Sequence, residues 1–208
     1  MEEIDKVLEA LSVVEKYEDY LFLRSLGRSL LVIGTILPLG MFILINADLL
    51  ALITGLDSGV MGLYANILTL ILCWGLVMYS FIGAWRTQRK ESDRESGGAL
   101  HAPLIALVWF LSFIMTSFAP TELILIAMLW AASVSCLLSF VILRLTHSHG
   151  QELLILYLGL VLGVTSFLLL AILDSTITGI LVPLVFSFCF IAAGIMMHRQ
   201  ASEALQAK

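Results

Sequence analysis

The residues of this chain best suited to metal binding are its histidines and cysteines. His147 and His149 lie two positions apart with Glu152 nearby, and side chains of these types bind zinc or nickel. Thiols, which can bind soft metals such as Cu(I), occur in three separate apolar segments, at Cys73, Cys136 and Cys189. A short loop tolerates His-x-His without a ligand, and a cysteine in an apolar helix packs as a small hydrophobic residue. We therefore expect no metal site and no cofactor.

The apolar segments of the chain also lack the groups that catalysis needs. Away from their ends they contain no Asp, Glu, Lys, Arg or His. Hydrolysis at membrane depth by a serine or an aspartate needs a base or a second carboxylate beside it. Sequence signatures of phosphate-binding loops, dinucleotide-binding loops and zinc hydrolases are absent as well. We therefore expect that the protein is not an enzyme.

Two further kinds of polar residue have separate explanations. Asp57, Glu122 and Asp174 stand at or just before the start of apolar segments, where carboxylates cap helices and face the positive end of the helix dipole. A ring of carboxylates at a channel mouth is the alternative. Uncharged polar residues inside or next to the segments are candidates for a solute path: Asn46, Asn66, Thr69, Ser112 and Thr116.

These residues must be positioned by helices that cross a membrane. The chain is 60% hydrophobic and 13% charged, which is far from a soluble domain. Six apolar runs approach or reach the ~20 residues that a helix needs to cross hydrocarbon. They cover residues 29–46, 60–85, 101–118, 121–143, 153–173 and 176–197. The sequence thus predicts an all-α integral membrane protein whose six spans form three hairpins.

The charges predict the orientation of these spans. All eleven Lys and Arg residues fall on one side of the six-span arrangement, and none lies inside a span. Because basic residues remain on the cytoplasmic side, we expect a multi-pass protein of the cell membrane with both termini in the cytoplasm. A net charge of −5 offers no basic surface for nucleic acid, so the lipid bilayer is the first expected partner.

The residues before the first span predict a short cytoplasmic helix. Its apolar side chains recur at helical spacing, at Ile4, Val7, Leu8, Leu11, Val14 and Leu21. Its polar face is acidic, whereas a helix that lies on an anionic membrane surface is normally basic. We expect this stripe to dock on a protein, either a partner or the protein's own cytoplasmic loops; a merely solvated leader is the alternative.

Small residues and prolines indicate how the spans pack. Gly159 and Gly163 form a GxxxG pattern, and Ser135 and Ser139 have the same spacing, which permits close approach within the chain or in self-association. Hinges of a moving carrier are a second possibility for the glycines and prolines of the first and last spans, Gly34, Pro38, Gly179 and Pro183.

Together these patterns predict an organisation and two function classes. Residues 1–23 form the amphipathic helix, residues 24–199 the membrane domain and residues 200–208 a cytoplasmic tail. The first function class is an accessory or scaffold subunit of a membrane assembly, which docks through its N-terminal helix. The alternative is a small permease or channel that transports a neutral or weakly polar solute.

Overall fold

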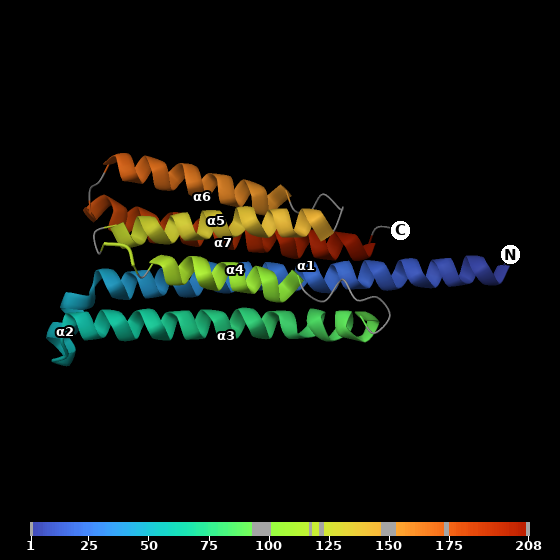
Figure 1. Cartoon of the computed structure of the whole chain (residues 1–208), viewed down its shortest axis with the longest axis horizontal. Coiled ribbons are helices and arrows are strands. Elements are labelled where there is room, and N and C mark those ends of the chain that lie inside the picture. The colour runs from blue at the N-terminus through green and yellow to red at the C-terminus, as the bar shows by residue number, and fades with distance from the viewer. Residues whose placement is uncertain are drawn as a thin grey trace.

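The computed structural model describes residues 2–92, 101–116, 118–120, 123–146, 153–172 and 175–206. Nearly all of these residues are helical, and the helices run alongside one another as a bundle (Figure 1). The helices are α1 (Glu2–Ile45), α2 (Ala47–Thr54), α3 (Ser58–Ser92), α4 (His101–Thr116), α5 (Ile124–Thr146), α6 (Leu153–Ile172) and α7 (Ser175–Gln206).

Within the described residues, five helices are long and apolar enough to cross a membrane: α1, α3, α5, α6 and α7. The segment predicted as the third span is the shorter helix α4, whose 16 residues extend about 24 Å at ~1.5 Å per residue. It ends at Thr116 because the chain then turns toward Pro120, with the Phe118 amide donating to the Met115 carbonyl. The fold is therefore that of an all-helical, polytopic membrane protein. That α4 also crosses the membrane, which would make six spans, stays a prediction.

Helix α1 combines two elements that the sequence suggested were separate. The expected N-terminal helix and the first span are one unbroken helix of 44 residues, whose span begins at Tyr20. No proline lies between the two parts, and Gly27 at their junction is buried in contact with α7. The N-terminal residues of α1 project beyond all the other helices (Figure 1). We call residues 2–19 the stalk.

A short helix connects α1 to α3. Helix α2 ends at Gly55, whose φ of 72° is the left-handed conformation that glycine adopts most easily. Asp57 then caps α3, because its Oδ1 accepts hydrogen bonds from the amides of Gly59 and Val60. We refer to this end of the bundle as the α2 end, and to the opposite end, where α7 finishes, as the terminal end.

The most extensive helix contact is between α1 and α7, which run antiparallel. Gly27 approaches the Gly194 carbonyl, and a Cβ atom at Gly34 would lie 2.7 Å from the Cβ of Phe190. The Ser187 hydroxyl donates a 2.9 Å hydrogen bond to the Gly34 carbonyl across the same interface. Small residues thus bring the first and last helices into backbone contact.

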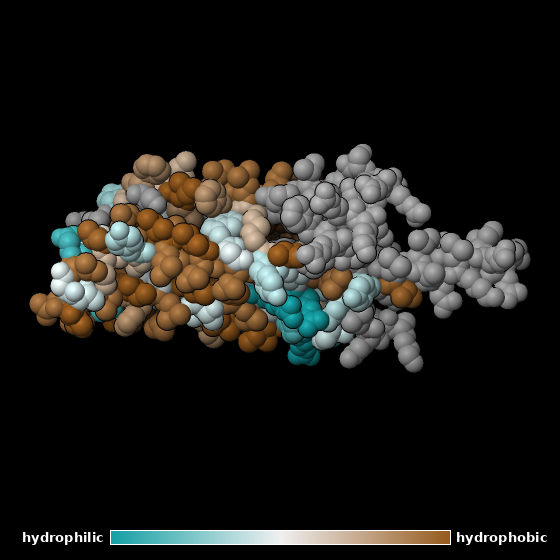
Figure 2. Space-filling model, turned by 90° about the horizontal axis from the view of Figure 1, so that it is seen from below, coloured by the Kyte–Doolittle hydropathy of each residue, from teal (hydrophilic) through white to brown (hydrophobic). Residues whose placement is uncertain are grey.

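The other helices pack around this pair. Helix α3 packs on α1, α4 on α5, and α5 on α6. Helices α6 and α7, which we expected to form the third hairpin, contact each other much less than they contact α5 and α1 respectively. The face shown in Figure 2 is hydrophobic along most of the described bundle, and strongly hydrophilic residues lie near both ends of that stretch.

Candidate functional site

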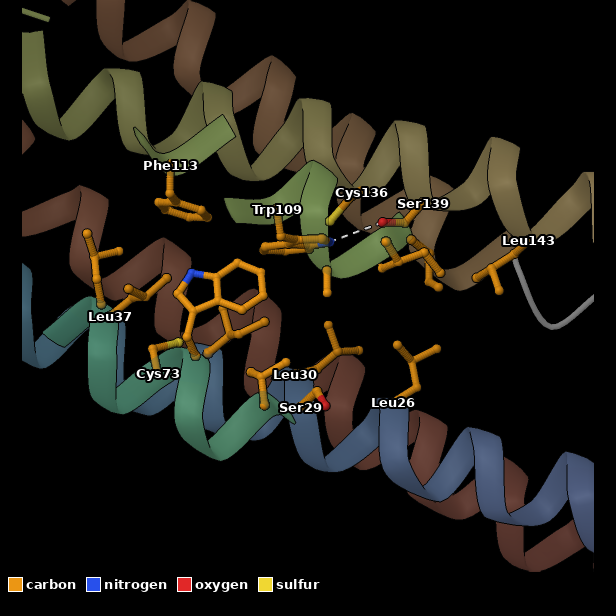
Figure 3. Close-up of a pocket in the computed structure, with 17 residues that line it drawn as sticks. Leu26, Ser29, Leu30, Leu37, Cys73, Trp109, Phe113, Cys136, Ser139 and Leu143 are labelled. Carbon is orange, nitrogen blue, oxygen red and sulfur yellow. Dashed lines mark hydrogen bonds between the residues drawn. The ribbon is translucent and has the colours of Figure 1, made fainter. Parts of the chain in front are cut away.

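A narrow pocket lies between α1 and α3 on one side and α4 and α5 on the other. Figure 3 shows the two rows of side chains that face each other across it, from Leu37 and Phe113 to Leu26 and Leu143. The cavity volume is about 60 Å³. None of its lining residues is charged at neutral pH, so the pocket offers a mainly apolar environment.

Trp109 of α4 is a buried tryptophan in the wall of this pocket. Its indole Nε1–H donates a 3.0 Å hydrogen bond to the Ser139 hydroxyl of α5. Its rings stack on Phe113 at 6.0 Å between centroids and meet Phe190 of α7 edge-on at 5.8 Å. The hydrogen bond and the two ring contacts hold the indole at the pocket wall. We did not single out Trp109, although a tryptophan in the middle of an apolar segment was a usable signal.

Two of the three cysteines line this pocket, Cys73 from α3 and Cys136 from α5. They lie on opposite sides of it in Figure 3. Cys189 lies on α7 and is half-buried. Within the residues that the structure describes, no group of three or more Cys, His, Asp or Glu side chains is placed to hold a metal ion. His147 and His149 lie outside those residues.

The five candidates for a solute path lie in different surroundings. Thr69 and Thr116 meet at a second, smaller cavity of about 10 Å³ beside Gly40. Ser112 and Thr116 line an open groove formed by α4, α5 and α6. The side-chain amide of Asn46, just after the end of α1, donates to the Phe42 carbonyl.

Asn66 lies in α3, and its side chain is outside the description. Of the five candidates, the structure therefore brings Thr69 and Thr116 together at one cavity, which has room for about one water molecule.

The predicted packing residues lie between α4, α5 and α6. A Cβ atom at Gly159 would lie 3.0 Å from the Cβ of Cys136, and one at Gly163 would lie 2.9 Å from the Ser133 hydroxyl. Ser133 donates a 2.7 Å hydrogen bond to the Gly159 carbonyl, which ties α5 to α6. Ser139 instead faces Trp109 of α4.

Ser135 is also buried, but its hydroxyl bonds within α5, to the Ala131 carbonyl.

The residues considered as hinges lie inside continuous helices. Pro38 is within α1 and Pro183 within α7, and both helices run through them. Gly34 is packed against Phe190, whereas Gly179 of α7 has only Ile45 near its missing side chain, at 3.9 Å. Gly194, which we did not single out, is packed as closely as Gly34, since a Cβ atom there would lie 2.7 Å from Leu31. A Cβ atom at Gly27, also not singled out, would lie 3.0 Å from the Gly194 carbonyl oxygen.

The predicted docking stripe lies in α1, almost entirely within the stalk. Leu21 is half-buried where the stalk meets the bundle, and the other stripe side chains lie outside the description. Two stalk side chains that the structure describes are exposed, Val13 by 61% and Tyr17 by 50%. Just below the stalk, Arg24 donates a 2.7 Å hydrogen bond to the Tyr20 hydroxyl and lies over its ring. The stalk thus carries exposed apolar side chains at Val13 and Tyr17, neither of which belongs to the predicted stripe.

No protein-family model, curated protein or solved structure matches this chain.

Proposed function

We propose that this protein is an accessory or scaffold subunit of a membrane assembly, which holds a cytoplasmic partner on its N-terminal stalk. The membrane domain has six spans in this proposal, with α4 as the third, and both termini are cytoplasmic. The cell membrane is the expected location. The observation that carries the proposal is the unbroken course of α1 from its span into the projecting stalk.

Apolar side chains on one side of a projecting helix call for an explanation. Residues 2–19 extend about 27 Å at ~1.5 Å per residue, and the N-terminal part of this length lies beyond the end of α7 (Figure 1). Val13 and Tyr17 leave apolar surface exposed on the stalk. The sequence adds the predicted stripe, which contains Ile4, Leu8 and Leu11. Burial of such surface on a partner releases roughly 25 cal/mol per Å².

The charges of the stalk indicate what the partner presents. Seven of its residues are Asp or Glu and two are Lys, which disfavours an anionic lipid surface and also a parallel pairing with a second stalk. A hydrophobic groove with a basic rim is complementary to both the stripe and the acidic face.

Site-specific photocrosslinking in native membranes tests this proposal. A benzophenone amino acid is placed at Leu11 or Val14 in the stripe, and at Glu9 on the acidic face as the matched control. We expect the stripe positions to capture one protein of constant mass, and Glu9 to capture much less of it. Adducts with lipid alone, with the protein's own loops, or with many proteins equally from all three positions would contradict docking of a partner through the stripe.

The alternative function, a small permease or channel, draws on the cavity at Thr69 and Thr116. A Thr69→Val variant keeps the shape and removes one hydroxyl from this cavity. If the protein transports a neutral solute along this route, uptake into proteoliposomes falls in the variant. Absence of uptake by the unmodified protein across a panel of neutral solutes would count against the alternative.

A further inference from the structure

The pocket between α1, α3, α4 and α5 has the shape of a slot. Its lining on α1 runs from Leu26 to Leu37, which corresponds to about 16 Å along the helix at ~1.5 Å per residue. A cavity of about 60 Å³ that extends over this length is narrow. The smaller cavity beside Thr69 lies next to the slot on the side of the α2 end, because Leu37, Leu70 and Phe113 line both. A long, thin space along the helices fits an extended hydrocarbon chain better than a compact ring.

The chemistry of the lining favours an apolar occupant. Leucine, isoleucine and aromatic side chains from α1, α3, α4 and α5, with Ile155 of α6, make up most of it. Two of its polar groups are already hydrogen-bonded within the protein, since Trp109 donates to Ser139 and the Ser29 hydroxyl donates to the Ser25 carbonyl. The slot lies within the apolar windows of α1, α3 and α5, so the molecules that surround it at this depth are lipid chains.

The slot has a side on which the protein is weakly closed. Helix α3 packs on α1 but makes few contacts with α4, and one of these is the edge-to-face pair of Trp74 and Phe110 at 5.5 Å between centroids. Only 6% of the apolar window of α3 is buried, against 50% for α5. A helix held on one side can separate from α4 with little loss of packing, and a chain can then enter between Trp74 and Phe110.

We infer that this slot binds one acyl chain of a membrane phospholipid, which enters from the bilayer between α3 and α4. The cavity is smaller than the ~150 Å³ that accommodates benzene in a protein interior, so the structure corresponds to the closed slot. Binding widens it by moving α3 and Trp74 outward. This site is independent of docking at the stalk.

Quenching of Trp109 by brominated lipid tests the inference. A single-tryptophan protein that retains Trp109 (Trp74→Phe, Trp85→Phe, Trp130→Phe) is reconstituted in phosphatidylcholine with bromines at mid-chain. Trp109 is 9% exposed and lies away from bulk lipid, whereas Trp130 is 37% exposed. We expect Trp109 emission to fall by an amount comparable with that of a Trp130-only protein. Full emission from Trp109 beside quenched Trp130 would overturn the inference.

A variant that fills the slot distinguishes quenching by an acyl chain inside the slot from quenching by bromines outside the protein. Ala106→Phe adds a ring to the slot lining, and Leu107→Phe adds the same ring to an exposed position next to it on α4. We expect the first variant to restore Trp109 emission and the second to leave the quenching intact. Equal quenching in both variants would show that the bromines act from outside, and would overturn the inference.

A measurement on the unmodified protein covers the case in which the Ala106→Phe variant does not fold. A phospholipid with a diazirine at mid-chain is photolysed in the reconstituted protein, and the labelled peptides are mapped. We expect labels at slot residues such as Cys73, Trp109 and Cys136. Labels confined to exposed positions such as Leu107 and Val134 would overturn the inference.

Discussion

At the scale of single residues, the bundle depends on a few positions where no larger side chain fits. A Cβ atom at Gly34 would come within 2.7 Å of Phe190, whereas a Cβ atom at Gly75 of α3 would have no atom of the described residues within 4 Å. These two glycines therefore have opposite roles, although both stand in apolar helices. Membrane helices associate through such close packing, because burial of apolar surface from lipid gives little driving force.

The first prediction compares these two glycines. Gly34→Ala introduces an overlap with Phe190 and is expected to lower the free energy of unfolding by about 1–3 kcal/mol. Gly75→Ala fills open space and is expected to be neutral or to stabilise by up to ~1 kcal/mol through helix propensity. Unfolding by dodecyl sulfate in mixed micelles, followed by circular dichroism, measures both. Equal stability of the two variants would show that α1 and α7 do not meet at Gly34.

The second prediction concerns the hydrogen bond between Trp109 and Ser139. Ser139→Ala leaves the indole N–H without its acceptor at a buried position. Hydrogen bonds between membrane helices contribute about 0.6 kcal/mol on average and reach roughly 1.7, so a loss in this range is expected. A double-mutant cycle with Trp109→Phe isolates the pair. A coupling energy of zero would mean that the two side chains do not interact in the bilayer.

At the scale of elements, the continuity of α1 determines where the stalk can present its stripe. Because α1 runs from Glu2 to Ile45 without a break, the orientation of its membrane span sets the orientation of the stalk. A flexible joint at residues 20–24 would leave the same stripe free to lie on the membrane surface.

The third prediction tests the stiffness of this joint. Spin labels at Val13 and Ser202, both exposed, report the distance between the stalk and the end of α7 in a background where the cysteines are alanine. One narrow distance distribution is expected. Tyr17→Pro, which disrupts a helix at a cost of roughly 3 kcal/mol or more, should broaden it, whereas Tyr17→Ala should not. A broad distribution in the parent protein would contradict a stiff stalk.

The sequence was informative about the elements because hydropathy reports helix length. Helix α6 spans Leu153–Ile172 where residues 153–173 were predicted, and α5 is displaced by about a turn from the predicted 121–143. The shortness of α4 follows from a turn before Pro120. Continuity of α1 was harder to foresee, because an amphipathic pattern that gives way to an apolar one resembles two helices.

The rotation of each helix was not readable from the sequence. Helices such as α4, α5 and α6 are apolar all round, so their composition does not show which side faces the protein. This rotation brings Gly27 against Gly194 and places Cys73 and Cys136 on the lining of one pocket. For the same reason, candidates such as Thr69 and Ser112 proved to lie in separate surroundings.

At the scale of the whole molecule, the charges are distributed by end. Asp48 and Asp57 lie at the α2 end, whereas Arg24, Arg144 and Arg199 lie toward the terminal end. The hydrophobic stretch in Figure 2 separates the two ends. This distribution supports the orientation in which the stalk faces the cytoplasm.

The fourth prediction tests this orientation. Leu52→Cys in α2 and Ser202→Cys in α7 each introduce one exposed thiol in a protein whose own cysteines are alanine. In intact cells, a membrane-impermeant maleimide is expected to label Leu52→Cys, and to label Ser202→Cys only after the membrane is permeabilised. Labelling of Ser202→Cys in intact cells would place the stalk outside the cell and would contradict docking of a cytoplasmic partner.

The central claim, that the stalk docks a partner, is tested most directly by the native mass of the protein extracted gently from its own membrane. The full-length chain is compared with a chain that starts at Tyr20, which removes the stalk and keeps the membrane spans. We predict that the full-length protein migrates as a complex with one defined additional protein, and that the shortened chain loses this protein while remaining folded. A monomer or a homo-oligomer of the same composition in both cases would contradict the account.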